Sequence, residues 1–131
     1  MRGLDTNVLL RLILSDDAAQ AERADGFVEV SCSADDPCWI NRIVLVETAC
    51  VLQSGYGYSR QDVATIIENI LRTEIFTVEN AAEAWSATKS YRESGADFAD
   101  CLIGTINRAQ GFAETVTFDR AAAKLDQFIG V

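Results

Sequence analysis

The chain has 131 residues, 49% of them hydrophobic, and its 20 acidic and 11 basic residues give a net charge of −9. This length and apolar content predict a single domain over residues 1–131 with a core of its own. The sequence contains no histidine, which excludes Ser-His-Asp and Cys-His nucleophilic sites and nucleases that use histidine as acid and base. Any hydrolysis therefore has to rely on carboxylates, with a metal ion as the expected helper.

The negative charge has the wrong sign for a simple nucleic-acid binder, which usually presents a basic face. Two interpretations remain open at this point. The acids either keep the protein soluble, or several of them converge and bind divalent cations, whose positive charge would help to accept a phosphate substrate. The total charge does not distinguish between the two.

Neither a signal peptide nor an apolar run of roughly 20 residues is recognisable, so we expect a cytoplasmic protein without a membrane span. The four cysteines include no CxxC pair, which argues against a structural zinc site. Disulfides are disfavoured in a reducing compartment. We therefore expect Cys50 and Cys101 to be small buried side chains, and leave open whether Cys32 and Cys38 face each other across a loop.

The first half of the chain alternates short strand-like runs with helical ones. Strands are predicted at residues 1–5 and 37–40, and helices at residues 5–14, 16–32, 42–53 and 60–71. Phe27 and Val28 are expected to face inward from the second helix. Ser59, spaced from Asp62 as in a capping box, is expected to cap the fourth.

The second half continues the alternation. Strands are predicted at residues 75–78, 115–118 and 128–131, and helices at residues 80–92, 97–109 and 119–126. Alternating strands and helices predict an α/β fold with a parallel sheet covered on both faces. In such folds, binding sites lie beyond the carboxyl ends of the strands.

Glu47 is the first acid with an unusual setting, because it lies in the apolar run Ile43 to Leu52. A helix this apolar is expected to be buried nearly all round, where an ionised Glu needs a compensating partner. The alternative is that Glu47 points along a thin solvent-facing stripe, paired with Arg42. The apolar run alone does not favour a buried Glu47 over a solvent-facing one.

Asp100 lies among apolar residues in the same way, and Asp97 shares its helix face three positions earlier. Their mutual repulsion would favour a cation beside them. A role as helix N-cap explains Asp97 equally well, but it does not explain Asp100, which lies one turn further in.

Asp5 and Asp119 each follow a strand-like run and precede a helical one. Taken singly, each is most simply an N-cap. Together with Glu47 and Asp100 they come from four separate elements, and their convergence would form an oxygen-rich pocket suited to Mg²⁺ or Mn²⁺. That convergence is a hypothesis.

Four motifs, taken in order, resemble those of PIN domains. The segment from Leu4 to Leu10 is similar to the start of that family. Val46-Glu47 and residues 96–103 are similar to its middle motifs, and Thr117-Phe118-Asp119 to its last. The order and spacing agree over the whole chain, which resembles in particular the VapC toxins of type II toxin–antitoxin modules.

This resemblance implies a three-layer α/β/α sandwich with a central parallel sheet. It implies an endoribonuclease that hydrolyses RNA phosphodiester bonds with a metal-activated water, a small cognate antitoxin as partner, and a homodimer. The acids implied to be catalytic and to bind Mg²⁺ or Mn²⁺ are Asp5, Glu47, Asp100 and Asp119. The resemblance also implies that Asp97 is an accessory metal ligand. It implies that three small polar residues orient the site, namely Thr6, Asn7 and Thr117.

The strong acidity departs from what an RNA-binding surface needs, and leaves open how RNA is held. Candidate phosphate contacts are Arg11, Arg42, Arg108 and Arg120. Two other classes compete with the nuclease. A phospho-accepting signalling domain would need a lysine near the acids, and neither of the two lysines closes a predicted strand. An inactive PIN-like binding module would have no use for the full set of acids.

Overall fold

The computed structural model describes residues 1–14 and 16–131. In these residues the helices are α1 (Thr6–Ile13), α2 (Ala18–Ser31), α3 (Arg42–Cys50), α4 (Arg60–Arg72), α5 (Ala81–Glu93) and α6 (Phe98–Ala109), with a π-helical turn η1 (Val51–Gly55) and a 3-10 turn η2 (Ala122–Lys124). The strands are β1 (Arg2–Gly3), β2 (Cys38–Ile40), β3 (Phe76–Val78), β4 (Thr115–Thr117) and β5 (Phe128–Gly130).

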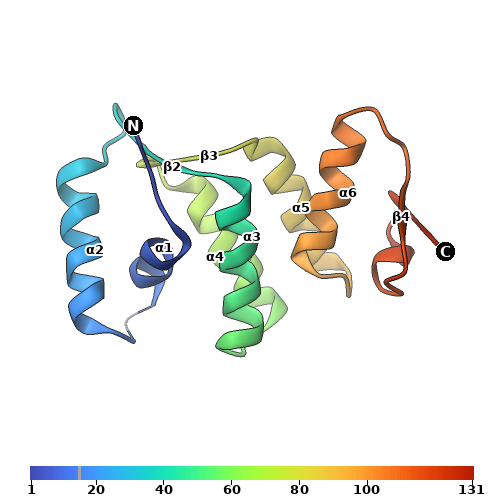
Figure 1. Cartoon of the computed structure of the whole chain (residues 1–131), viewed down its shortest axis with the longest axis horizontal. Helices are drawn as coiled ribbons and strands as arrows, with labels where there is room; N and C mark the ends of the chain where they lie inside the picture. The colour runs from blue at the N-terminus through green and yellow to red at the C-terminus, as the bar shows by residue number, and fades with distance from the viewer. Residues whose placement is uncertain (15) are drawn as a thin grey trace.

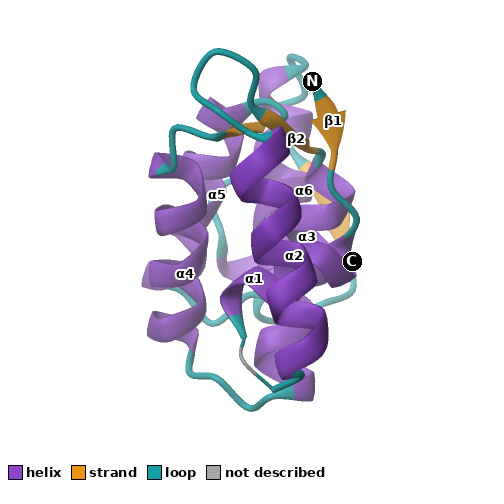
Figure 2. Cartoon of the chain, turned by 90° about the vertical axis from the view of Figure 1, so that its left-hand side faces the viewer, coloured by secondary structure: helices purple, strands orange, loops and turns teal. Residues whose placement is uncertain are grey.

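All the described strand pairs are parallel, which confirms the predicted α/β class. One sheet has the order β1-β2-β3, with Arg2 opposite Cys38 and Cys38 opposite Phe76, and a second sheet pairs β4 with β5. The two sheets lie apart, since β2 and β3 run along the upper edge between α2 and α5 while β4 lies beyond α6 (Figure 1). The view at right angles shows β1 and β2 crossing one end of helices that stand side by side (Figure 2).

The core is one cluster of buried side chains to which all six helices and the strands β2 and β3 contribute. Its largest fully enclosed side chains include Leu9, Ile40, Leu45, Leu52, Ile67 and Tyr91. The Tyr91 ring meets Phe98 edge to face, at 5.8 Å between centroids, and so joins α5 to α6. This geometry is one that aromatic pairs prefer.

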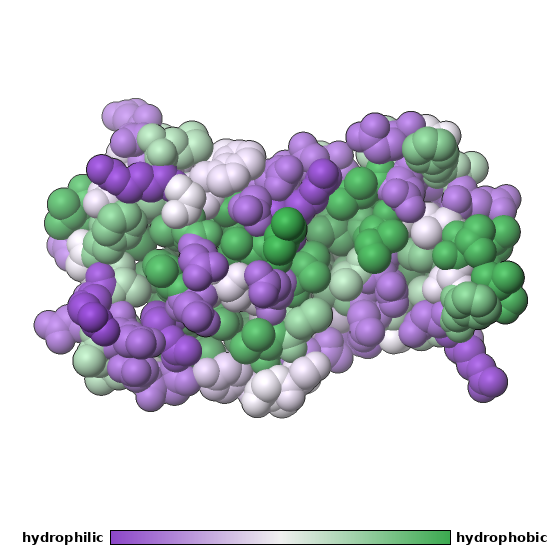
Figure 3. Space-filling model, viewed as in Figure 1, coloured by the Kyte–Doolittle hydropathy of each residue, from purple (hydrophilic) through white to green (hydrophobic). Residues whose placement is uncertain are grey.

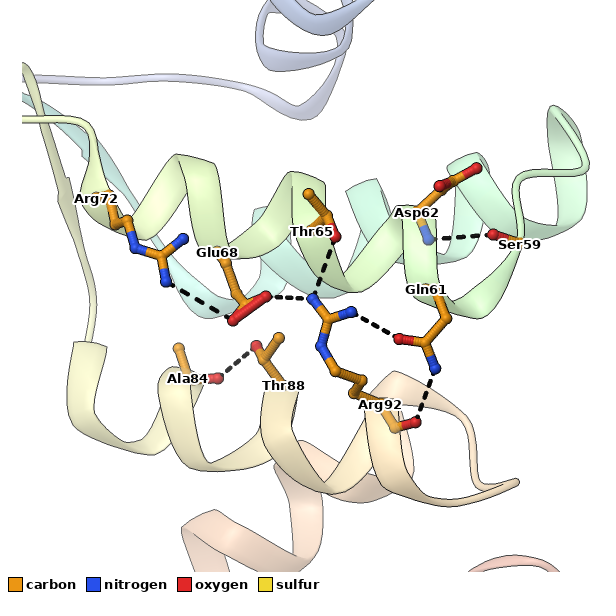
Figure 4. A network of polar contacts seen from close by, with 9 residues as sticks. All are labelled: Ser59, Gln61, Asp62, Thr65, Glu68, Arg72, Ala84, Thr88 and Arg92. Carbon is orange, nitrogen blue, oxygen red and sulfur yellow. Dashed lines mark hydrogen bonds and ion pairs between the residues drawn. The ribbon is translucent and has the colours of Figure 1, made fainter.

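A polar network on the outer side ties α4 to α5, and Arg92 is its centre (Figure 4). Its guanidinium donates to Glu68, to the Gln61 side chain at 2.6 Å and to the Thr65 hydroxyl at 3.2 Å. Gln61 donates back to the Arg92 carbonyl at 3.2 Å. Because each partner is itself fixed on a helix, the network sets the register between the two helices.

Some local predictions were wrong, each for a tertiary reason. Phe27 is 40% exposed rather than inward, because α2 turns Ala24 and Val28 toward the core instead. The helix predicted over residues 119–126 is only the short turn η2, because the chain is already extended at Leu125 to let Phe128 pair with Thr115.

A disulfide joins Cys32 at the end of α2 to Cys38 at the start of β2, with 5.4 Å between the Cα atoms. The sequence had left their relation open and disfavoured disulfides in general. Both residues are buried, so the bond fastens the end of α2 to the sheet. In the described part of the chain, no helix has the length and apolar character that crossing a membrane requires.

The contact between α6 and the second sheet depends on Gly104. A Cβ at this position would lie 2.5 Å from both Gln127 Cγ and Phe128 Cε2. We expect Gly104→Ala to lower the free energy of unfolding by roughly 1–3 kcal/mol, because overpacking displaces β5. Urea denaturation followed by circular dichroism measures this.

The matched control is Gly26→Ala, since Gly26 lies inside α2 with nothing within 4 Å of an added Cβ. That change should raise the free energy of unfolding, by up to about 1 kcal/mol, through helix propensity alone. Equal stability of Gly104→Ala and the unaltered protein would contradict the packing described for β5.

Reduction of the Cys32–Cys38 bond should lower the free energy of unfolding by about 2 kcal/mol, because the short closed loop gains freedom in the unfolded chain. Denaturation with and without a reductant measures the difference. The double variant Cys32→Ser, Cys38→Ser should show the loss without reductant and no further response to it. If the reductant still lowered the stability of that variant, the loss could not be assigned to the Cys32–Cys38 bond.

Candidate acidic active site

Asp5 stands where the chain leaves β1 and enters α1. Its carboxylate accepts a hydrogen bond of 2.8 Å from the Thr6 amide and occupies the N-cap position of α1. The side chain is nevertheless exposed. The capping interpretation therefore holds, and an anion at the positive end of a helix stays available to a ligand.

Thr6 links this helix to Glu47. Thr6 is buried, and its hydroxyl donates a hydrogen bond of 3.0 Å to Glu47 Oε1. The acceptor lies 41 positions later in the chain, on α3. One hydroxyl thus brings the first and second acidic motifs together and orients the Glu47 carboxylate.

Glu47 lies on the open side of α3, so the solvent-facing alternative is the correct one. Arg42, the partner considered for it, instead pairs with Glu79, at 3.7 Å between Arg42 Nε and Glu79 Oε2. Glu47 is in none of the ion pairs of the described residues, and the core takes up the other side of the helix. The buried residues of α3 are Val44, Leu45, Thr48 and Ala49.

Arg60 fixes the loop that precedes α6. Its guanidinium donates to the carbonyls of Tyr91 at 3.1 Å, Gly95 at 3.1 Å and Ala96 at 2.5 Å, and lies 4.4 Å from the centre of the Tyr91 ring. Asp97 follows as N-cap residue of α6, yet its side chain makes no capping hydrogen bond. The exposed carboxylate of Asp97 is therefore not committed to the helix end.

Asp100 lies one turn into α6 and is half-buried. Burial raises the pKa of its carboxyl group, and the negative charges of Asp119 and Asp97 raise this pKa further. Among the described residues, no ion pair includes Asp100. A bound cation would oppose the effect of burial and of the two negative charges on this pKa, because an opposite charge favours the ionised form.

Asp119 reaches Asp100 from the second sheet. Its amide donates to the Thr117 hydroxyl at 3.0 Å, and its carboxylate accepts from the Ala122 amide at 2.8 Å. The expected N-cap role is not met, because the N-cap position of η2 is Ala121 and Asp119 lies two residues before it. These bonds fix the loop after β4 so that the Asp119 charge acts on the first turn of α6.

The Cys50 thiol at the end of α3 lies near carboxylates of both α3 and the start of α6. Cys50 is exposed, so the expectation of a small buried side chain was wrong for it. Partial burial of its thiol still raises the pKa, and the charges of Asp97 and Glu47 raise this pKa further. Carboxylates from both helices therefore face a common region. The acids form two neighbouring groups, one of Asp5 with Glu47 and the other of Asp97, Asp100 and Asp119.

Carboxylate oxygens are the ligands that Mg²⁺ and Mn²⁺ prefer, so the chemistry of these side chains fits either ion. Their spacing is wider than a metal requires: within residues 1–14 and 16–131, no three His, Cys, Asp or Glu side chains are placed to hold one ion.

The model of the PIN domain family matches residues 4–127, a range that contains all four acidic motifs. The chain belongs to the PIN-domain family. It is also 32% identical over 125 residues to the VapC ribonuclease of Aquifex aeolicus (strain VF5), an alignment that covers 95% of this chain and 92% of that protein. The resemblance inferred from the motifs is thereby confirmed.

Arg60 is a residue of this PIN domain whose role no sequence pattern indicates. Its three acceptors are carbonyls more than 30 positions away, and backbone carbonyls carry no residue-type signal. Asn7, by contrast, lies where expected, exposed in the first turn of α1 after Asp5.

Replacing Asp119 with Asn should lower the pKa of Asp100 in this PIN domain, because it removes a like charge that disfavours ionised Asp100. A carboxyl-carbon NMR titration of the metal-free protein measures this. Asp126→Asn is the matched control, since Asp126 is exposed in the same C-terminal segment and does not act on Asp100. An unchanged Asp100 pKa in Asp119→Asn would contradict the proximity.

Proposed function

We propose that this PIN domain is a metal-dependent endoribonuclease that hydrolyses RNA phosphodiester bonds, as the toxin of a type II toxin–antitoxin pair. The observation that carries the proposal is the gathering of acids from separate elements: half-buried Asp100 lies close enough to Asp119 and Asp97 for their charges to act on it, and the Thr6 hydroxyl joins Glu47 to the helix that Asp5 caps. Carboxylates gathered in this way are typical of functional sites. The likeness to a VapC ribonuclease supports the nature of that function.

In this proposal Mg²⁺ or Mn²⁺ is held by carboxylates from both groups, namely Asp5, Glu47, Asp97, Asp100 and Asp119. When bound, the ion lowers the pKa of a water and offsets charge on the phosphate oxygens. The Thr6 hydroxyl holds Glu47 Oε1, and the Thr117 hydroxyl holds the Asp119 amide. Asp5, Glu47, Asp100 and Asp119 are the proposed catalytic acids, with Asp100 or Glu47 taking the proton of the water.

The proposed partners are RNA, a small antitoxin and a second copy of the chain, in the cytoplasm, with residues 1–131 acting as one domain. An apolar surface between α3 and α6 supports a protein contact. Ile43 is 67% exposed and Ile103 is 47% exposed there, beside Val46 and Leu102. Figure 3 shows apolar residues gathered over the middle of this face. Exposed apolar patches of this kind mark interfaces.

An inactive binding module is the second candidate, and the wide spacing of the acids favours it. The two candidates differ in their response to metal. A nuclease should bind Mn²⁺ through the acids and cut RNA, whereas a binding module needs no metal.

The decisive assay is cleavage of a mixed pool of structured and single-stranded RNAs. We expect cutting with Mn²⁺ or Mg²⁺, none with EDTA, and a loss of roughly a hundredfold or more in Asp5→Asn, because a metal ligand supplies several kcal/mol of transition-state stabilisation. Denaturing gels of end-labelled RNA give the rates.

Asp35→Asn is the matched control, since Asp35 is an exposed loop residue in none of the ion pairs that the described residues form. It should cut like the unaltered protein. Equal cutting by Asp5→Asn would trace the activity to a contaminant. Failure of all samples to cut, together with failure to bind Mn²⁺, would favour the binding module.

A further inference from the structure

A cleft of about 500 Å³ opens between α1 and α2 and reaches Asp5. Clefts that bind small ligands commonly measure roughly 300–1,000 Å³. The floor and one wall come from the end of β1 and from α1, and include Asp5, Asn7 and Arg11. The other wall comes from α2. We call this space the α1–α2 cleft.

The wall from α2 consists of Gln20, Arg23, Ala24 and Phe27. Each of these residues lies three or four positions from two of the others, so the four share one helix face. Such a face normally carries apolar side chains toward its neighbour helix. Here it carries an amide, a guanidinium and an aromatic ring, and Phe27 stays 40% exposed.

The cations of the cleft are unusual in so acidic a chain. Arg23 is exposed and takes part in none of the ion pairs that the described residues form. Arg11 is half-buried and holds Asp16, yet its Nε is buried and has no hydrogen-bond partner in the part of the chain described. A buried donor without a partner is costly, and a bound acceptor would relieve that cost.

We propose that the α1–α2 cleft binds one nucleotide of the RNA beside the phosphodiester that is cut, an inference that rests on the proposed ribonuclease function. Phe27 offers a face for base stacking, which is tolerant of sequence. Gln20 and Asn7 offer amides to the edge of the base, and Arg23 a cation to the phosphate. Because Asp5 lines the same cleft, a nucleotide here is continuous with the proposed metal site.

Binding is tested first, without cleavage. Nucleoside 5′-monophosphates are titrated in EDTA into the ¹⁵N-labelled full chain, and amide shifts are followed by NMR. We expect shifts confined to residues of α1 and α2 around the cleft, with Kd raised about tenfold in Phe27→Ala and in Arg23→Gln. Both side chains are exposed, so neither change should disturb folding.

Lys89→Gln is the matched control, since Lys89 is an exposed cation on α5, outside the cleft. It should leave Kd unchanged. Shifts outside the cleft, or equal Kd for all variants, would overturn the proposal. A short acidic peptide is titrated in parallel, and its binding in the cleft where nucleotides fail would assign the cleft to a protein partner and also overturn it.

Cleavage of a randomised RNA with Mn²⁺ then tests the position of the nucleotide. Sequencing of the ends should show a base preference at one position next to the cut, which Phe27→Ala flattens while raising KM about tenfold and changing kcat little. Cutting by the unaltered chain with no effect of Phe27→Ala would overturn the nucleotide site and leave the nuclease standing. Nucleotide binding in the cleft without any cutting would overturn the nuclease and leave the nucleotide site standing.

Discussion

The contact on which the arrangement of the acids most depends is the one between Arg60 and the loop before α6. A single guanidinium donates to two carbonyls of that loop, Gly95 and Ala96, and to the carbonyl of Tyr91 on α5, and it lies over the Tyr91 ring. Such hydrogen bonds from a charged donor are stronger than neutral ones. They fix where α6 begins, and hence where Asp97 and Asp100 lie. Gly104 on the same helix then seats β5, whose partner β4 leads to Asp119.

Electrostatic repulsion is the opposing constraint. The chain has a net charge of −9, and the charges of Asp119 and Asp97 act on half-buried Asp100. The hydroxyl of Thr6 donates to the Glu47 carboxylate, and the hydroxyl of Thr117 accepts from the Asp119 amide. Both hydroxyls are uncharged, so they position the acids without cancelling the charge that a cation would need.

An acidic chain can bind RNA if its positive charges are concentrated where the RNA lies. Arg23 lines the cleft beside Asp5 and makes no ion pair among the described residues, and Arg11 lines it while paired with Asp16. Arg42 and Arg92 lie outside the cleft and pair with Glu79 and Glu68. The disulfide from Cys32 to Cys38 fastens the end of the helix that carries Arg23. Attachment to the sheet limits how far that wall of the cleft can move.

The sequence by itself determined the parallel pairing and the order of the elements, apart from the last helix. Ser59 caps α4 as predicted, and Asp5 caps α1, because caps and periodic apolar residues are local signals. Tertiary structure alone decided that Glu47 faces solvent, that Phe27 is exposed and that Asp119 acts on Asp100. Each of these depends on residues distant in the chain, and burial and charge interactions follow distance in space, which no spacing in the sequence records.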